Sequence, residues 1–245
     1  MTFDDERLAA IYDIDNPDGP DHDYFRAFVN EARPEVVTDL GCGTGILTVT
    51  LTAPGRKVIG IDPAPAMLAK ASSRPGGRDV EWRLGTSHRI PPRSTDVVIM
   101  SGNVAMHILG EEWPGTLRDV AAGLRDGGHL VFESRNPLAR AWLGWNDPPS
   151  ERDTPAGRLR ESLTTDPPDD NGVVTMHCHN EFVDDGMVLD IDQRLQFRTF
   201  EELCTDLMEA GFRVVNVWSD WERTSFTGTS NENLVVFEAQ LFATH

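Results

Sequence analysis

Hydrophobic and polar positions follow one rhythm from residue 36 to about residue 135. Short apolar runs, typical of buried strands, are separated by longer stretches with helical spacing. The pattern predicts strands at residues 36–40, 57–61, 79–84, 94–100 and 129–133, and helices at 46–53, 64–73 and 113–124. Strands that alternate with helices in this way pair in parallel through right-handed crossovers. This part of the chain therefore predicts an α/β sheet.

A second rhythm begins after the fifth strand. Alternating segments surround a patch rich in proline and aspartate, and Asp184-Asp185-Gly186 is typical of a hairpin turn. These segments predict a small antiparallel sheet, with strands at residues 158–165, 173–183 and 187–197. A helix at 200–210 and two closing strands at 212–218 and 233–242 follow. The whole predicts a seven-stranded, mostly parallel sheet with helices on both faces and an antiparallel insertion after strand five.

Three parts of the chain follow from this reading. Residues 1–135 are expected to form N-terminal helices and a ligand-binding core, and residues 199–245 to complete that core. Residues 136–198 are expected to form the inserted sheet. Two purposes for the insertion remain open at this stage: a cap over a substrate, or the surface of a homodimer.

The composition of the chain argues against several classes of binding partner. The 245 residues include 40 acidic and 22 basic side chains, a formal net charge of −18, which repels a phosphate backbone and disfavours nucleic acid. No run of eighteen apolar residues is present, so no membrane-spanning helix is expected. The acidic N-terminus does not resemble a signal peptide. Three scattered cysteines without a CxxC pair predict reduced thiols in the cytoplasm.

The most informative segment is VVTDLGCGTG, residues 36–45. Its glycines allow a sharp turn after the strand and a close approach of backbone to a ligand. A dinucleotide-type G-x-G-x-x-G pattern fails, because Ile46 and Thr48 stand where the third glycine would be. The pattern present is D-x-G-x-G-x-G.

This pattern resembles motif I of the class I S-adenosylmethionine-dependent methyltransferases, and four further segments match that family in order. They are GID at residues 60–62, GTS at 85–87, STDVV at 94–98 with NVAMHIL at 103–109, and LRDGGHL at 124–130. The family has Gly-Asp-Ala where GTS stands, and proline where Asp126 stands. The resemblance covers about residues 36–135 and implies a Rossmann-like fold.

The resemblance also implies S-adenosylmethionine as the cofactor and a set of contacts to it. Asp62 is expected to accept hydrogen bonds from the ribose hydroxyls, and Met67 to pack on the adenine. The full set of expected cofactor-binding residues is Asp39, Gly41, Cys42, Gly43, Thr44, Gly45, Asp62, Pro63, Met67, Thr86, Ser87, Ser101 and Asn103. Asp39 suits the ammonium, and the loop's backbone donors suit the carboxylate. Alternatively, Asp39 only holds the loop, and Asp62-Pro63 only forms a turn.

Two side chains are candidates for acceptor chemistry at the carboxyl edge of the sheet, where open α/β sheets bind ligands. His107 is a candidate general base, or a loop histidine that caps a helix. Glu133 is a candidate substrate ligand, or half of a polar network with Arg135. We carry both forward as candidate catalytic residues.

For other candidate residues we favour a structural role over a functional one. Tyr12 and Tyr24 lie in segments that close over the cofactor in similar methyltransferases, but core packing explains either ring. His177 and His179 share a strand face, but no further ligand is spaced nearby, so no metal is expected. The tryptophans at 142, 145, 218 and 221 suit a hydrophobic seam beneath the insertion better than a substrate pocket.

The sequence thus predicts transfer of a methyl group to a small molecule by in-line displacement. A protein or nucleic-acid methyltransferase is the first alternative, but the D/N-P-P-Y/F tetrapeptide of amino-methylating enzymes is replaced by Ser-Gly-Asn-Val at residues 101–104. A non-catalytic S-adenosylmethionine-binding module is the second, and the sequence does not exclude it.

Overall fold

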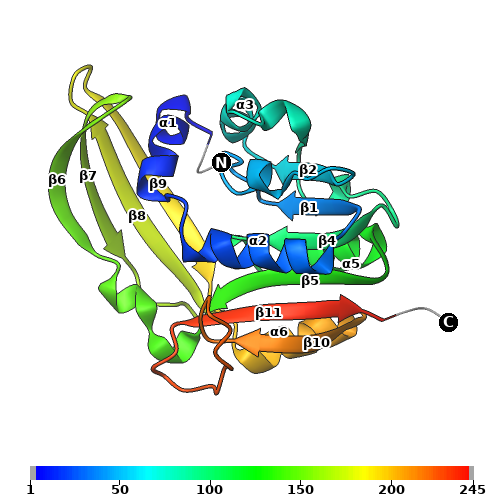
Figure 1. Cartoon of the computed structure of the whole chain (residues 1–245). Helices are drawn as coiled ribbons and strands as arrows, with labels where there is room; N and C mark the ends of the chain where they lie inside the picture. Colours follow the sequence, from blue (N-terminus) through cyan, green and yellow to red (C-terminus); the bar gives the residue numbers. More distant parts are fainter. Residues whose placement is uncertain (1–3, 243–245) are drawn as a thin grey trace.

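The computed structural model describes residues 4–242 and contains a seven-stranded and a four-stranded sheet (Figure 1). The strands of the larger sheet are, in spatial order, β10 (Phe212–Trp218), β11 (Leu234–Leu241), β5 (Leu124–Arg135), β4 (Thr95–Met100), β1 (Val36–Leu40), β2 (Lys57–Asp62) and β3 (Glu81–Leu84). The five strands from β5 to β3 are parallel, and β11 and β10 join antiparallel. The predicted fold class is confirmed.

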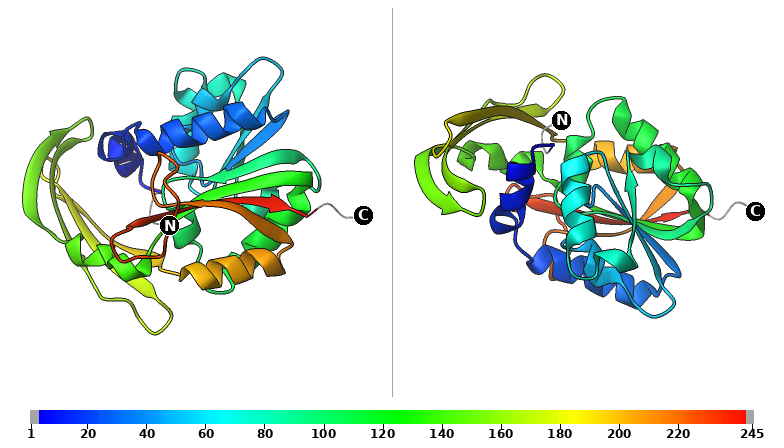
Figure 2. Two further views of the ribbon diagram at one scale, coloured as in Figure 1. Left: turned by 60° about the horizontal axis from the view of Figure 1, so that its bottom comes forward. Right: turned by 90° about the horizontal axis from the view of Figure 1, so that it is seen from above.

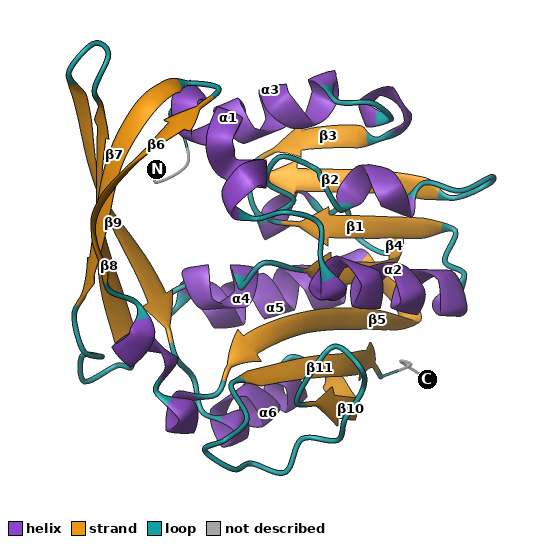
Figure 3. Cartoon of the chain, turned by 60° about the vertical axis from the view of Figure 1, so that its left-hand side comes forward, coloured by secondary structure: helices purple, strands orange, loops and turns teal. Residues whose placement is uncertain are grey.

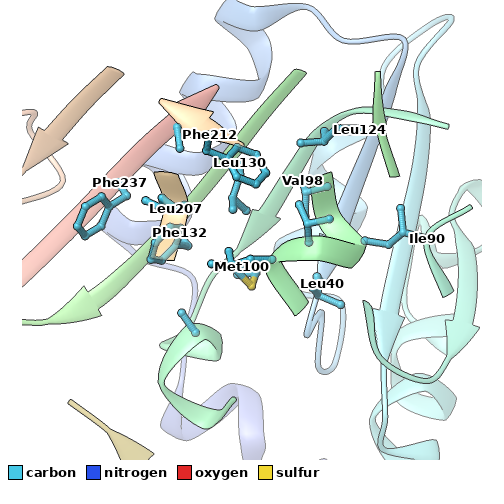
Figure 4. Close-up of a cluster of buried hydrophobic side chains, with 14 of the residues drawn as sticks. Leu40, Ile90, Val98, Met100, Leu124, Leu130, Phe132, Leu207, Phe212 and Phe237 are labelled. Carbon is cyan, nitrogen blue, oxygen red and sulfur yellow. The ribbon is translucent and has the colours of Figure 1, made fainter. Parts of the chain in front are cut away.

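Helices cover both faces of this sheet because successive side chains of a buried strand point to opposite sides. In β4, Val98 and Met100 pack with α5 (Glu112–Gly123) and α6 (Phe200–Glu209), as Figure 4 shows for part of the cluster. Val97 and Ile99 pack instead with α2 (Pro20–Ala32) on the other face. The view from above in Figure 2 shows the sheet between these layers.

Three short helices lie at the carboxyl ends of the parallel strands. They are α1 (Glu6–Asp15), α3 (Pro65–Ser73) and α4 (Val104–His107). The strand arrows in Figure 3 point toward them and toward the smaller sheet. This edge is where the sequence-predicted site residues come together.

The smaller sheet follows β5 in the chain and stands beside the carboxyl edge (Figures 1 and 3). It is antiparallel, in the order β6 (Asp147–Thr154), β7 (Gly157–Thr165), β8 (Val173–Phe182) and β9 (Met187–Gln196). The sequence predicted three of its strands but not β6, which carries two consecutive prolines. An edge strand tolerates proline, because its outer N–H groups need no ladder partner.

One predicted helix is wrong. Residues 46–53 form turns and a short 3₁₀ segment, Thr48–Leu51, rather than an α-helix. The hydroxyls of Thr50 and Thr52 donate to the carbonyls of Leu47 and Val49, at 2.6 and 2.9 Å. Threonine side chains that bond nearby backbone in this way compete with the helical ladder.

The fifth strand is longer than predicted. It runs from Leu124 to Arg135 and begins directly after α5, so Gly127-Gly128 lies inside it rather than ending the helix. Within residues 4–242, no helix combines the length and apolar character needed to cross a membrane.

Candidate active site

The three glycines of the loop, Gly41, Gly43 and Gly45, are required for different structural reasons. All three have positive φ: +78° at Gly41, +52° at Gly43 and +71° at Gly45. A Cβ at Gly41 would lie 2.5 Å from a Val104 methyl, and one at Gly45 would lie 2.6 Å from the Trp82 ring. At Gly43 the nearest atom would be a Tyr12 ring carbon, 4.0 Å away. Gly41 and Gly45 therefore serve packing, while Gly43 leaves room beside Tyr12.

The loop's own amides are largely occupied. Gly41 and Cys42 donate to the Ile61 carbonyl, at 2.7 and 3.1 Å, and Gly45 donates to the Cys42 carbonyl at 2.9 Å. Gly43 donates to Asp62 Oδ2 at 2.8 Å. The sequence predicted these donors for the carboxylate of a ligand, but here they hold the turn against the second strand.

Asp62 ends β2 beneath the glycine loop. Its Oδ2 accepts from Gly43 and its Oδ1 accepts from the Ala64 N–H, also at 2.8 Å. The residue is only 7% exposed, and burial raises the pKa of its carboxyl more than these bonds lower it. A carboxylate offers about four lone-pair positions, so roughly two remain for a ligand diol.

Asp39 is the penultimate residue of β1 and is 1% exposed. Its Oδ2 accepts from the Thr48 hydroxyl at 2.6 Å, while Oδ1 is shielded from solvent without a hydrogen-bond partner among residues 4–242. Burial raises the pKa of this carboxyl to about 6, against a smaller opposing effect of the Thr48 bond. Because a buried polar atom without a partner is costly, Asp39 suits a cationic ligand group.

Helix α1 covers the loop. Asp13 accepts from the Thr44 hydroxyl and from Arg74, both at 2.5 Å, and Lys70 donates to the Ala9 carbonyl at 2.8 Å. Met67 of α3 is buried against Ala9 and Ala64, with Tyr12 packed beside them. These contacts bring the residue expected on the adenine next to the N-terminal helix.

Tyr12 connects the loop to the acceptor side. Burial raises the pKa of its hydroxyl to about 12, and the carboxylates of Asp62, Asp13, Asp21 and Glu133 add to the effect. Asp62 and Glu133 must both lie near Tyr12 for their charges to act on it. The sequence favoured simple core packing for this ring, and gave no signal that Glu133 would influence it.

Glu133 lies near the end of β5 and is 2% exposed. Its Oε1 accepts from the Asn103 backbone N–H, while its Oε2 is shielded and has no partner in the described part of the chain. Asn103 adopts a left-handed conformation, with φ +62°, and its side-chain oxygen accepts from Arg135 Nε at 3.2 Å. Burial raises the pKa of Glu133 to about 7.

His107 is the last residue of α4. Its side chain keeps an exposed surface, yet nearby protein displaces enough water to lower the pKa of the imidazole. The preceding residue, Met106, is buried under Val174 and Leu195 of the inserted sheet. His107 is therefore held at the junction of the two sheets.

The remaining predicted cofactor residues differ in how they are engaged. Cys42 is buried toward Gly60, and Ser87 donates to Asp119 of α5 at 2.7 Å. Thr86 is exposed and hydrogen-bonds the His88 ring at 2.8 Å. Pro63 and Ser101 are half-buried beside the loop and after β4. Contacts of these five residues with a cofactor remain predictions.

The inserted sheet touches the core at two places. At one end, Leu159 and Phe182 bury Ile11 of α1, and Arg152 pairs with Asp15 at 2.7 Å. At the other end, Val174 and Leu195 cover Met106. Since both contacts come from the same face of the sheet, that inner face is turned toward the carboxyl edge.

The tryptophans divide between two clusters. Trp142 and Trp145 pack around Phe197 beside the inserted sheet, as predicted, whereas Trp218 and Trp221 pack with α2, where Trp221 lies against Tyr24. Tyr24 is buried and donates to Glu238 at 2.8 Å. His177 lies between Asp166 and Asp192, and His179 pairs with Asp190. Within residues 4–242, no group of three or more His, Cys, Asp or Glu side chains is arranged to hold a metal.

The residues at this edge fit S-adenosylmethionine. Asp39 offers a buried oxygen without a partner, Asp62 has spare acceptor capacity, and Gly43 is the one loop glycine beside open space. Met67 lies in the apolar cluster that also contains Ala9 and Ala64, with Tyr12 packed against it. This combination suits a cationic, hydroxyl-bearing ligand with a flat ring.

Comparison with known proteins also indicates a methyltransferase. A family model described as a methyltransferase domain matches residues 37–128. The cypemycin N-terminal methyltransferase of a Streptomyces species is 29% identical over 221 residues, covering 87% of this chain and 88% of that protein.

Solved structures share the fold along almost the entire chain. The CcbJ methyltransferase from Streptomyces caelestis has a TM-score of 0.76 at 24% identity and covers 99% of both chains. S-adenosylmethionine-bound CalS10, an amino pentose methyltransferase from Micromonospora echinaspora involved in calicheamicin biosynthesis, has a TM-score of 0.65 at 21% identity, covering 94% of this chain and 96% of its own. The methyltransferase domain match runs from β1 into β5, and a methyltransferase aligns along nearly nine tenths of the sequence, so this chain is similar in sequence and fold to S-adenosylmethionine-dependent methyltransferases.

Proposed function

We propose that this enzyme methylates a small molecule held between the carboxyl edge of the seven-stranded sheet and the inner face of the inserted sheet. The observation that carries the proposal is the position of α1. One side of this helix binds the glycine loop through Asp13, and the other side packs on the inserted sheet through Ile11. The cofactor loop and the inserted sheet are thereby held over the same edge.

The cofactor is assigned to the glycine loop and its neighbours. Asp39 faces the ammonium, Asp62 the ribose hydroxyls and Met67 the adenine. The other assigned residues are Gly41, Cys42, Gly43, Thr44, Gly45, Pro63, Thr86, Ser87, Ser101 and Asn103. When bound, S-adenosylmethionine supplies an electrophilic methyl group, whose carbon bonds to the acceptor's lone pair while the sulfur keeps the electrons of the broken bond.

The chain's own contribution is mainly alignment. Holding an acceptor in line supplies effective molarities of roughly 10⁵–10⁸ M in well-oriented systems. The elements available for this are α1 with Tyr12, the β4–α4 turn with Asn103, and the inserted sheet. Tyr12 and Asn103 both lie near Glu133 at this edge.

The strand register supports an acceptor wall on the inserted sheet. Leu163 pairs with Cys178, and Cys178 pairs with Ile191, so these three side chains form one row on the inner face. The contacts with α1 and α4 are made two rows away on either side, by the pairs Leu159–Phe182 and Val174–Leu195. The middle row is half-buried and joins no buried cluster of the described residues. It suits the apolar body of an acceptor.

A small acceptor is favoured over a polymer. The net charge of −18 opposes nucleic acid, and the relatives named above act on cypemycin and on an amino pentose. We also propose a cytoplasmic location, which the three free cysteines support.

The cap and the homodimer surface make opposite predictions for adjacent residues of β7. Leu163 points to the inner face and Thr164 to the outer face. With a cap, Leu163→Arg raises the acceptor KM and leaves cofactor affinity unchanged, while Thr164→Arg changes neither. With a dimer surface on the outer face, Thr164→Arg instead lowers the mass measured by light scattering.

His107 is proposed to position the acceptor from α4. Because alignment carries the reaction, His107→Ala is expected to raise the acceptor KM several-fold with cofactor affinity unchanged. If the imidazole removes a proton during transfer, kcat falls instead by roughly 10²–10⁴-fold. Steady-state kinetics across pH separate the two roles.

The function as a whole is tested with calorimetry and a labelled cofactor. S-adenosylhomocysteine is expected to bind with micromolar affinity, and labelled methyl to appear in a low-molecular-weight product. Tighter binding of NADH would overturn the cofactor assignment. Cofactor binding without transfer to any member of a broad metabolite library would favour a non-catalytic binding module.

A further inference from the structure

Two buried glutamates stand on neighbouring strands, and their surroundings differ. Glu238 of β11 accepts from Tyr24 at 2.8 Å, from Trp218 at 2.9 Å and from Asn216 at 2.6 Å, so both of its oxygens are engaged. Glu133 of β5 has one engaged oxygen, and its Oε2 is shielded without a partner in the described residues. Glu238 is satisfied by the protein, whereas Glu133 leaves a buried acceptor open.

One carboxylate and one guanidinium act on the ionisation of Glu133. Asp21 of α2 disfavours its ionised form, and Arg135 on the same strand favours it, with Asp21 the stronger influence. The Arg135 guanidinium donates to the Asn103 side chain. On α1, Tyr12 lies near enough to Glu133 for the charge of that carboxyl to raise the pKa of its hydroxyl. The partner across the ladder on β11, Val236, carries no charge.

We propose that Glu133 binds the nitrogen of the acceptor, and that the acceptor is an amine with an apolar body. Either an ammonium or a hydroxyl can donate to the open Oε2, but only a cationic N–H donor also offsets the negative charges of Glu133 and Asp21. The half-buried row Leu163, Cys178 and Ile191 receives the apolar body. This inference rests on the proposed methyltransferase function and specifies its substrate class.

Glu133 also accepts the proton that occupies the nitrogen lone pair of an ammonium and so prevents its methylation. One proton passes from the ammonium nitrogen to Oε2, so the carboxylate becomes a carboxylic acid and the nitrogen regains the lone pair that forms the new bond to carbon. The methylated product carries one positive charge, and the proton on Glu133 returns to solvent after release. The pKa of an α-ammonium is roughly 8. Transfer of its proton to Glu133, whose pKa is about 7, therefore costs far less free energy than transfer to a glutamate with an ordinary pKa.

The experiment uses a matched pair of probes, L-phenylalanine amide and its hydroxyl counterpart 3-phenyllactamide, as the first members of a panel of amines and alcohols. Carbon-13 NMR of glutamate-labelled enzyme with S-adenosylhomocysteine follows the titration of Glu133. The amines are expected to lower its midpoint by about one pH unit or more, while the alcohols leave it unchanged.

Two variants complete the test. Glu133→Gln is expected to weaken amine binding by about tenfold or more, the effect of losing one charged hydrogen bond. Glu238→Gln, the matched buried control, is expected to keep amine binding even where it lowers stability. With labelled cofactor, the wild-type enzyme methylates amines of the panel and not their alcohol counterparts.

Several outcomes overturn the proposal. They are equal midpoint shifts with alcohols, no shift with any amine, or unchanged amine binding in Glu133→Gln. In each of these cases retained binding of S-adenosylhomocysteine leaves the proposed function standing. Loss of cofactor binding in the wild-type enzyme would instead remove the proposed function itself.

Discussion

The carboxyl edge of the parallel sheet and the outer face of the inserted sheet both carry many acidic groups, but these groups differ in their hydrogen-bond and ion-pair partners. On the outer face, Arg160 pairs with Glu151 and Glu181, and His177 pairs with Asp166 and Asp192. At the edge, Asp39 and Glu133 are buried with an oxygen left open in the described residues. Acidic groups on the outer face have partners within the protein, whereas those at the edge keep an oxygen that a ligand could bind.

The two regions also differ in energetic cost. Exposed ion pairs contribute about 0–1 kcal/mol each and are easily replaced by water. A buried acceptor without a partner costs about 1–3 kcal/mol, which the folded protein retains only where something else is gained. Substitutions at the edge should therefore change binding, and substitutions on the outer face should change little.

The largest expected effect comes from the loop backbone. Gly43 and Gly186 both have positive φ, +52° and +70°, and a Cβ at either would meet no atom closer than 4.0 Å. Gly43→Val and Gly186→Val thus carry a similar backbone strain of roughly 1–3 kcal/mol. Only Gly43→Val should weaken S-adenosylhomocysteine, by about 100-fold or more, because its side chain enters the ligand's space. Calorimetry showing equal affinities for the two variants would remove the loop from the site.

Next comes the ribose contact. Asp62→Ala should weaken S-adenosylhomocysteine by roughly 10- to 150-fold, since one hydrogen-bonded charged group contributes about 1.5–3 kcal/mol. The control is Asp190→Ala on the outer face, which should leave affinity unchanged. Similar losses in both variants, measured by calorimetry, would mean that net charge rather than the edge governs binding.

A third prediction concerns stability without ligand. The pKa of Glu133 rises from 4.5 to about 7 on folding, so the folded protein holds this proton more tightly than the unfolded chain. Wild type should therefore lose stability relative to Glu133→Gln as pH rises from 4.5 to 7, by on the order of 3 kcal/mol. Urea unfolding at pH 5 and pH 8 measures this, and a pH-independent difference would contradict a buried ionisable Glu133.

The smallest effect is expected at His177. Hydrogen bonds that the imidazole donates to Asp166 and Asp192 raise its pKa. Its contribution to stability is therefore complete below pH 6.5 and disappears as pH rises through the raised value. His177→Gln should slightly lower the melting temperature at pH 6, without effect at pH 9, and leave cofactor affinity within about twofold. A large change in affinity would make the outer face part of the site.

The sequence by itself determined the fold class and the position of the cofactor loop. Strands as apolar as β4 have few alternatives, and D-x-G-x-G-x-G after a strand is a local signal, because turn and backbone conformation depend on adjacent residues. The same local reasoning failed for residues 46–53, where threonine hydroxyls took backbone carbonyls that a helix would have used.

Only the tertiary structure decided which charges remain open. Glu133 and Glu238 look alike in sequence, each within an apolar strand, but Glu238 meets Tyr24, Trp218 and Asn216 from α2 and β10, and the Oε2 of Glu133 meets no such donor among residues 4–242. Likewise, alternation predicted strands in the insertion but not which face would turn toward the core. Both outcomes depend on contacts between segments far apart in the chain, and hydrogen-bond satisfaction and burial are properties of those contacts rather than of either segment alone.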